Sequence, residues 1–519
     1  MSLKYSGVSV FLLAAAIGLV VPQKPVIAAA LFHPALTFDS GGRDLSDLTA
    51  ADVNGDGVQD LITANASGGV GILLGTGNGT FQAALTYQPG CNAVAVGDLN
   101  ADGRLDLVVA VSGAAGSVAV LLGNGDGTFQ PAVAYVSGLN FALDVAIADV
   151  NNDGKSDLLV ADCGPNGCAP GETGALGVLV GNGDGTFKAV TTYTGGQPIS
   201  LAVGDVNGDV KPDVVAANWQ HGTVGVLIGK GDGSFQTMQT YDVGALAPMS
   251  VALADLNGDG HLDIGVGSGV DDHNPGIPVG VLMGRGDGTF QPVVNYSSGG
   301  GERAAIAIAD VNGDAIPDLL ATSGCLLNDI GCEEGHIGVL AGKGDGTFQP
   351  AVLFGSGGRF PVSIAPADVN RDGGRDIAAA NYGSGGGSPG VVGLLLNNLT
   401  DSHAPVITIS VSPNILWPPN SMMVPVAVSG NISDGGSGVK PGSARYSVID
   451  DYGRVQPSGP VTLASDGNYS LVIWLQASRV GSDRDGRRYR ITVGATDNAG
   501  NNGSSQTSVV VPHDSAKGR

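Results

Sequence analysis

One nine-residue motif, repeated seven times, carries the side chains whose chemistry stands out in this sequence. Its first copy, residues 52–60, reads DVNGDGVQD, and every copy has Asp at positions one, five and nine and Asn at position three. Three carboxylates and one amide at alternate positions of a tight loop can bring four oxygen atoms to one point, and hard oxygen ligands suit Ca2+. The backbone carbonyl at position seven would add a fifth ligand, with water completing the shell.

The motif therefore predicts up to seven structural calcium ions. The predicted ligands are Asp52, Asn54, Asp56 and Asp60; Asp98, Asn100, Asp102 and Asp106; Asp149, Asn151, Asp153 and Asp157; Asp205, Asn207, Asp209 and Asp213; Asp255, Asn257, Asp259 and Asp263; Asp310, Asn312, Asp314 and Asp318; and Asp368, Asn370, Asp372 and Asp376.

An EF-hand is the first alternative, because its calcium loop begins with a similar pattern. That loop needs a Glu at position twelve and a helix on each side. Position twelve is never acidic here, since it holds Thr63, Val109, Val160, Ala216, Val266, Ala321 and Ala379. A second alternative is an Asp/Asn-rich turn without metal. Position six should adopt a left-handed backbone, so Val210 and Ala315, which replace Gly there, predict weaker calcium binding at sites four and six.

The residues around each motif predict the elements that hold it. An alternating apolar run precedes the motif, as in residues 251–254, and another apolar run follows, as in residues 158–160. This pattern is typical of a β-hairpin with the motif as its loop. After each of the first six copies comes a Gly/Asp turn between two further strands, as in residues 121–129. Each repeat thus supplies four strands, A to D.

The seventh repeat lacks its strand D, and a sequence that matches this strand lies at the other end of the chain. Residues 31–38, LFHPALTF, match the strand-D sequence of later repeats, such as residues 128–135, TFQPAVAY. The first strand can therefore complete the last unit and close a ring without an open sheet edge. The predicted fold is all-β, a seven-bladed β-propeller closed by the N-terminal strand over residues 31–399.

These motifs resemble the FG-GAP (VCBS-type) repeats of the integrin α-subunit propeller, which also occur in many secreted bacterial proteins. The resemblance covers about residues 31–398. It implies a seven-bladed propeller with calcium in the loops between strands A and B.

The N-terminus predicts export. Lys4, an apolar run over residues 8–21 and a small-residue triplet at residues 28–30 follow the order of a secretory signal peptide, so residues 1–30 would be removed. The run is shorter than the ~20 residues that span a bilayer, so we expect no membrane insertion. A net charge of −24, with 48 acidic against 24 basic residues, and no basic patch argue against nucleic acid as a partner.

Export makes disulfides possible. Two cysteine pairs each bracket a short loop, which predicts disulfides within the pairs Cys163 and Cys168, and Cys325 and Cys332. Cys91 is left over. Zinc is the alternative for the four cysteines, but neither pair has the two-residue gap of a zinc knuckle.

The face opposite the calcium loops has the irregular sequence and the candidate ligand residues. In an up-and-down blade the A–B and C–D turns share one face, and the B–C and D–A loops form the other. The B–C loops contain both cysteine pairs and the ligand-face candidates Trp219, His221, Asp271, Asp272, His273 and Tyr382. Alternatives are burial of Trp219 between blades and a solvated acidic loop at Asp271, Asp272 and His273.

The C-terminal region predicts a second domain. After a linker at residues 400–405, residues 406–512 hold short apolar alternations separated by turn residues, which suggests an Ig-like β-sandwich with Trp474 in its core and a tail at residues 513–519. Residues 489–501 resemble the closing strand and turn of bacterial immunoglobulin-like modules, which usually act as spacers or adhesive units.

The expected protein is therefore a monomeric, secreted or cell-surface calcium-binding module that adheres to a glycan or a matrix protein. No catalytic residues are expected, because only His221, His273 and His336 of the seven histidines fall in B–C loops and no nucleophile–base spacing is found. The alternatives are a secreted polysaccharide lyase or hydrolase, and a surface spacer without a ligand.

Overall fold

The chain is described here by a computed structural model. It covers residues 31–111, 117–138, 141–164, 168–169, 171–244, 247–269, 278–300, 305–324, 334–382, 389–398, 404–434, 439–453, 457–464, 467–478, 486–497 and 500–513. The predicted signal peptide, the ligand-face candidates Asp271, Asp272 and His273, and the pair Cys325 and Cys332 lie outside these residues. Within them, no helix is long and apolar enough to cross a bilayer.

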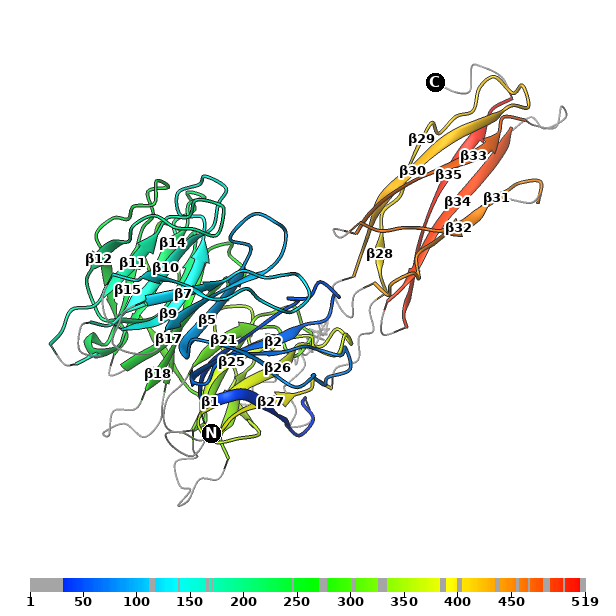
Figure 1. The fold of residues 1–519 in the computed structure, drawn as a ribbon. Helices are drawn as coiled ribbons and strands as arrows, with labels where there is room; N and C mark the ends of the chain where they lie inside the picture. Colours follow the sequence, from blue (N-terminus) through cyan, green and yellow to red (C-terminus); the bar gives the residue numbers. More distant parts are fainter. Residues whose placement is uncertain are drawn as a thin grey trace, which may run out of the picture.

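The first part of the chain folds into seven antiparallel four-stranded blades arranged in a ring (Figure 1). In the first three blades the strands A to D are the second half of β1 (Leu36–Ala51), β2 (Asp60–Ser67), β3 (Gly69–Leu73) and β4 (Leu85–Tyr87); β5 (Cys91–Gly97), β6 (Asp106–Val111), β7 (Ser117–Leu121) and β8 (Val133–Val136); and β9 (Ala142–Ala148), β10 (Asp157–Asp162), β11 (Ala175–Leu179) and β12 (Thr191–Thr194).

The next three blades follow the same order. Their strands are β13 (Pro198–Gly204), β14 (Asp213–Asn218), β15 (Thr223–Leu227) and β16 (Gln239–Asp242); β17 (Ala247–Ala254), β18 (Asp263–Gly269), β19 (Pro278–Leu282) and β20 (Val294–Ser297); and β21 (Ile306–Ala309), β22 (Asp318–Ser323), β23 (His336–Leu340) and β24 (Val352–Gly355).

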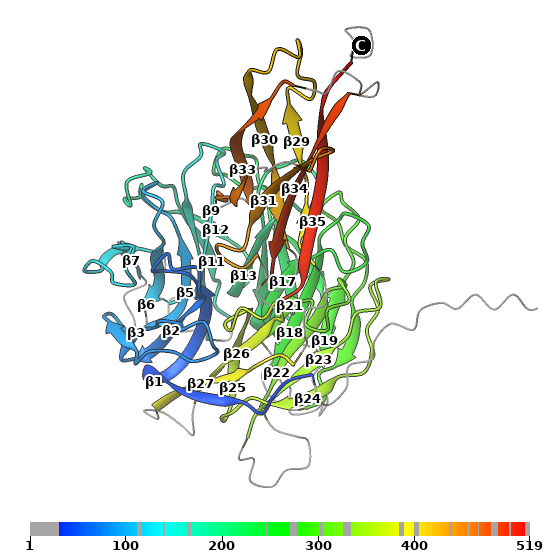
Figure 2. The same ribbon diagram turned by 90° about the vertical axis from the view of Figure 1, so that its right-hand side faces the viewer.

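The seventh blade closes the ring in the predicted way. Its strands A to C are β25 (Pro361–Ala367), β26 (Asp376–Asn381) and β27 (Pro389–Leu395). The first half of β1 pairs antiparallel with β27, for example Phe38 with Val392, and the second half pairs with β2. One continuous strand therefore serves as strand D of blade seven and strand A of blade one, and Figure 2 shows β1 in blue beside β27 in yellow. The predicted seven-bladed propeller closed by its N-terminal strand is confirmed.

An aromatic pair joins every blade to the next. An aromatic residue of strand D lies edge-on to the Phe that precedes strand D of the following blade, with ring centroids 5.1 to 5.7 Å apart. This geometry favours aromatic contacts. The seven pairs are Tyr87 with Phe129, Tyr135 with Phe187, Tyr193 with Phe235, Tyr241 with Phe290, Tyr296 with Phe348, Phe354 with Phe32, and Phe38 with Phe81.

The C-terminal strands form two further four-stranded sheets, which Figure 1 shows in orange and red as a body separate from the propeller. One contains β28 (Val406–Ile407), β29 (Ser410–Ser412), β30 (Met423–Ser433) and β33 (Asn468–Gln476), and the other β31 (Arg445–Asp450), β32 (Ser458–Pro460), β34 (Arg487–Thr496) and β35 (Asn502–Val511).

The inward side chains of these sheets, among them Val426, Ile473 and Ile491, make one apolar core. The expectation that Trp474 lies in that core is wrong, because its side chain is 56% exposed. Trp474 follows the buried Ile473 in β33, and successive side chains of a strand point to opposite faces.

Candidate functional site

All seven acidic motifs form the loop between strands A and B, and all seven loops have the same backbone turns. The residues at positions four and six have positive φ in every copy, as at Gly55 (72°) and Gly57 (78°). Position six was expected to be left-handed from the sequence. Position four was not, and it is occupied by Gly in four copies and by Ala101, Asn152 and Arg371 in the others.

The side-chain oxygens of each loop accept the loop's own backbone amides. In loop one, Asp52 Oδ1 accepts from the amides of Gly55 at 2.8 Å and Asp56 at 3.1 Å, and its Oδ2 accepts from Gly57 at 2.6 Å. Asn54 Oδ1 accepts from the amide of Asp56 at 2.9 Å, and Asp56 Oδ1 from that of Val58 at 2.7 Å. Positions one, three and five are thus turned towards the inside of one tight loop.

The Asp at position nine has a separate structural role, because it is fully buried and connects two segments of its blade. Asp60 Oδ2 accepts from the amide of Val53 at 3.0 Å, and Oδ1 accepts from Gly75, beyond the end of strand C, at 2.7 Å. The same two bonds form at Asp157, with Val150 and Gly181. This carboxylate therefore fixes the acidic loop to the end of strand C.

Burial raises the pKa of these aspartates, although the two amide bonds oppose the shift. The pKa of Asp60 rises to about 6, and those of Asp318 and Asp376 rise to about 7. The carboxylates at positions one and five of the same loop add to the increase by repulsion. Each loop thus gathers negative charge around a buried carboxylate.

Loops four and six keep the common conformation despite their side chains at position six. Val210 has φ 66° and Ala315 has φ 62°. Their amides donate to Asp205 Oδ2 and Asp310 Oδ2, both at 2.7 Å. The side chains are therefore accommodated by strain at one residue and not by a change of loop shape.

Two loops have a nearby cation. In loop four, Lys211 Nζ lies 3.0 Å from Asp209 Oδ2. In loop one, the guanidinium of Arg371, from loop seven, donates to the carbonyls of Asp56 at 2.8 Å and Gly57 at 3.1 Å. Among the residues that the structure describes, no three Asp, Glu, His or Cys side chains form a group that could hold a metal. A calcium site here would need the Asn and carbonyl oxygens as well.

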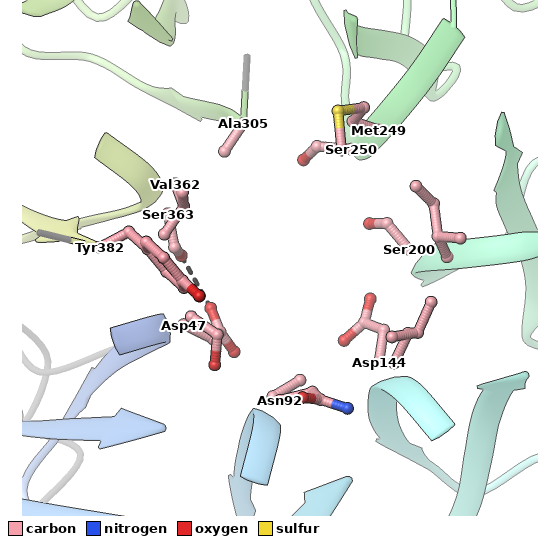
Figure 3. A pocket seen from close by; sticks show the side chains of 14 residues that line it. Asp47, Asn92, Asp144, Ser200, Met249, Ser250, Ala305, Val362, Ser363 and Tyr382 are labelled. Atoms are coloured by element: carbon pink, nitrogen blue, oxygen red, sulfur yellow. Dashed lines mark hydrogen bonds between the residues drawn. The ribbon is translucent and has the colours of Figure 1, made fainter. Parts of the chain in front are cut away.

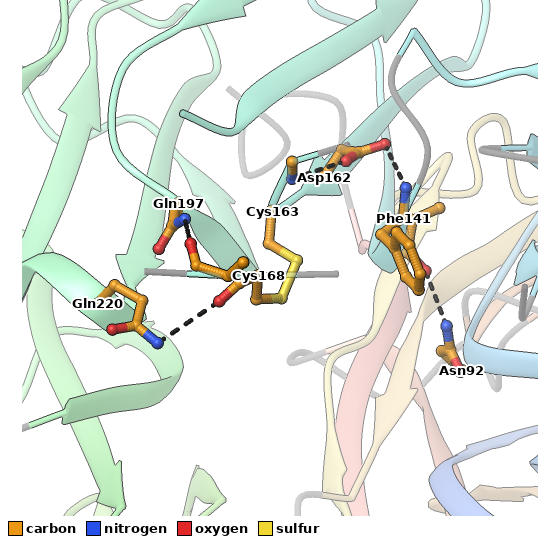
Figure 4. Close-up of a disulfide and its surroundings, with 10 residues drawn as sticks. Asn92, Phe141, Asp162, Cys163, Cys168, Gln197 and Gln220 are labelled. Carbon is orange, nitrogen blue, oxygen red and sulfur yellow. Dashed lines mark hydrogen bonds between the residues drawn. A yellow bond between two sulfur atoms is a disulfide. The ribbon is translucent and has the colours of Figure 1, made fainter. Parts of the chain in front are cut away.

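The opposite face carries the described ligand-face candidates. Trp219 and His221 form a 3-10 helix (Trp219–His221) that follows β14, and Trp219 is half-buried while His221 is exposed. Cys163 and Cys168 form a disulfide, the pairing expected from the sequence. Figure 4 shows that this loop of blade three is bound to blade four, since Gln220 donates to the carbonyl of Cys168 and Gln197 to that of Ala169.

Cys91 is buried and unpaired in the described chain. Burial raises the pKa of its thiol to about 12. A buried thiol of such low acidity behaves as a small apolar side chain, so we assign it no chemical role.

A pocket of about 270 Å³ on the ring axis was not predicted from the sequence (Figure 3). Strand A of every blade, or the residue just before it, lines this pocket, and Tyr382 is the one ligand-face candidate that reaches it. Its two acids, Asp47 and Asp144, lie five residues before the motifs that begin at Asp52 and Asp149. Comparing this position among the repeats would have found them, because the other five copies have Ala or Ser there.

The fold and the loops define a class, the β-propellers with an acidic loop in every blade. Residues 52–109, 98–160 and 205–266 match the FG-GAP-like repeat family, so the chain contains FG-GAP-like repeats. No curated protein matches the sequence.

Solved structures that resemble the chain include two crystal structures of BBS1N in complex with ARL6DN, one soaked with mercury and one with lead. Each is 13% identical to this chain, and the match covers 72% of this chain and 98% of the other. The TM-score is 0.48 for the mercury-soaked crystal and 0.47 for the lead-soaked one. These similarities are too distant to bear on function.

Proposed function

We propose that the protein is an exported, calcium-stabilised β-propeller that binds an extracellular glycan or a matrix protein through the face opposite its calcium loops. The observation that carries the calcium claim is the sevenfold repetition of one loop shape around clustered carboxylates. Like charges in one loop repel, and a bound divalent cation removes that repulsion.

The donor set of each loop fits calcium. In loop five, Asp255, Asn257 and Asp259 would supply side-chain oxygens, with Asp263 behind them, and calcium favours such oxygen ligands. Backbone bonds already hold Asp255 Oδ1 and Oδ2 and Asn257 Oδ1 in place, so these oxygens need little reordering. Calcium would serve stability here, because no general acid–base pair accompanies the loops.

The calcium claim is tested by comparing melting temperatures in calcium and in chelator. We expect a lower midpoint in chelator, because the loop carboxylates then repel without compensation. An unchanged midpoint would contradict calcium binding. Counting bound calcium in Asp259→Asn gives a residue-level test, and one ion fewer than in the wild type is expected.

Asp287→Asn is the matched control. Asp287 lies in an exposed C–D turn and accepts both of its bonds, from the amide and hydroxyl of Thr289, on Oδ1, which Asn retains. The calcium count should not change in this variant.

The ligand claim is tested on arrays of glycans and matrix proteins, using the propeller within the full chain. Trp219 beside His221 gives the binding face an aromatic surface next to polar groups, which suits a sugar ring. We expect Trp219→Ala to weaken binding at least tenfold. An array without a bound ligand would instead support the surface-spacer alternative.

The enzymatic alternative predicts turnover. Degradation of a polyuronate or similar polymer that is lost on His221→Ala or His336→Ala would replace the binding function by a lyase or hydrolase activity.

A further inference from the structure

The axial pocket lies towards the end of the ring away from the calcium loops, since all its lining residues except Tyr382 come five or six positions before these loops in the sequence. Two acidic side chains, Asp47 and Asp144, line it from blades one and three. Figure 3 shows the two carboxylates on either side of Asn92, facing the same opening. Both residues are half-buried, and both line the pocket.

A ring of hydrogen bonds between neighbouring blades passes through these positions. Asp47 Oδ2 accepts from the amide of Val94 at 3.1 Å, and Asp144 Oδ2 from that of Leu201 at 2.7 Å. Serines make the same connection elsewhere in the ring: Ser200 Oγ accepts from Val251 at 3.4 Å, and Ser250 Oγ from Ile306 at 3.2 Å.

A neutral serine therefore accepts the same backbone amide in two other blades. Asp47 accepts one bond more, because the Ser363 hydroxyl of blade seven donates to its Oδ1 at 2.7 Å. The interblade amide needs an acceptor at these two positions but does not need a negative charge. Two charges whose presence the fold does not require point to a role in binding.

These charges have no cation in the pocket. Its lining contains no Lys, Arg or His. Burial raises the pKa of Asp47 to about 6 and, together with the charge of Asp47, that of Asp144 to about 7. The ionised pair is therefore costly near neutral pH unless a positive group enters.

We propose that the axial pocket binds a small organic amine, with its ammonium groups beside Asp47 and Asp144. The rest of the lining suits the carbon chain of such a ligand, because it includes Ile199, Met249 and Val362 and the ring of Tyr382. The serine hydroxyls and the amide oxygen of Asn92 can accept further hydrogen bonds from the ammonium groups.

A metal ion fits the pocket less well than an amine. Calcium takes six to eight oxygen ligands. The pocket lining offers only two carboxylates, and these come from blades one and three, with blade two between them. This inference does not depend on the glycan or matrix ligand of the proposed function.

Calorimetric titration of the full chain in calcium-containing buffer tests the amine site. The probes are putrescine and butanediol, which has the same chain length without charge. We expect putrescine to bind at least tenfold more tightly than butanediol. Asp47→Ser and Asp144→Ser should each weaken putrescine binding at least tenfold, while the serine can still accept the backbone amide of the next blade.

Asp242→Ser is the control for net charge, since Asp242 is exposed in β16 outside the pocket. Its affinity for putrescine should stay within twofold of the wild type. Equal binding of the diol, full affinity in the double serine variant, or the same loss in Asp242→Ser would each overturn the proposal. If a serine variant does not fold, Asp144→Asn replaces it with the same expected loss. Loss of one bound calcium from the serine variants without a change in putrescine binding would assign the pocket to a metal.

Discussion

Position six of the acidic loops shows how strongly one backbone angle governs these turns. Val210 and Ala315 adopt the positive φ that Gly adopts in the other five copies. A left-handed backbone costs an L-residue roughly 1–2 kcal/mol. The five motifs with Gly avoid that cost, so the two exceptions are points where the sequence stores strain.

Replacing Val210 by Gly should stabilise the protein. The side chain of Val210 is 84% exposed, so its removal loses little packing, and Gly relieves about 1 kcal/mol of backbone strain. Chemical denaturation of both proteins measures the difference. Val136→Gly is the control, because Val136 is also exposed but lies in strand β8, where Gly should destabilise.

The pocket carboxylates should make stability depend on pH. The pKa values of Asp47, about 6, and Asp144, about 7, lie above their ordinary value of 3.8, so the folded protein binds these protons more tightly than the unfolded chain. Their contribution is therefore fully present below pH 3.8 and is lost as the pH rises through 6 and 7.

The double variant Asp47→Ser, Asp144→Ser should thus gain melting temperature relative to the wild type between pH 5 and pH 8. Thermal denaturation in amine-free calcium buffer measures the gain. A constant difference across that range would contradict the raised pKa values.

Among the strands and loops, the aspartate at position nine connects the acidic loop to the sheet. Asp157 accepts one amide bond on each oxygen while fully buried, and an Asn in its place keeps only one acceptor and brings in an unpaired NH2 group. We expect Asp157→Asn to cost about 2 kcal/mol of unfolding free energy.

Asp126→Asn is the matched control for Asp157→Asn. Asp126 is exposed in a C–D turn and accepts the amide and hydroxyl of Thr128 on Oδ1, which Asn retains. The unfolding free energies of the two variants, measured by denaturant titration, should differ by the cost at Asp157. Equal unfolding free energies would show that the two bonds of the buried aspartate do not stabilise the blade.

At the scale of the whole molecule, the ring depends on its first residues. Phe32 is 6% exposed and lies edge-on to Phe354, with ring centroids 5.1 Å apart, and it forms an isolated β-bridge with Asn397. The N-terminus thus fills the contact between blades six and seven that internal Phe residues fill elsewhere.

Phe32→Ala should therefore destabilise the propeller by about 3 kcal/mol, the usual cost of removing a buried Phe. Leu36→Ala in the same region is the control, because Leu36 is 42% exposed and its loss should cost less than about 1 kcal/mol. Equal effects on the melting temperature would mean that the end of the chain does not close the ring.

The blades, their number, their closure and the loops between strands A and B could be predicted from the sequence, because each of these depends on local patterns repeated along the chain. Alternating apolar residues predict the strands, and the sequence of residues 31–38 identifies them as the missing strand D. The left-handed position six was also readable, since Gly marks it in five of seven copies.

Which side chains meet across the ring could not be predicted from local patterns. Asp47 and Asp144 are far apart in the sequence, and they share a pocket because circular closure brings the strands A to one axis. The exposure of Trp474 was decided in the same way, because alternation says that neighbours in a strand face opposite sides and not which side another sheet covers. Local periodicity thus fixes elements, whereas contacts between distant residues depend on how those elements pack.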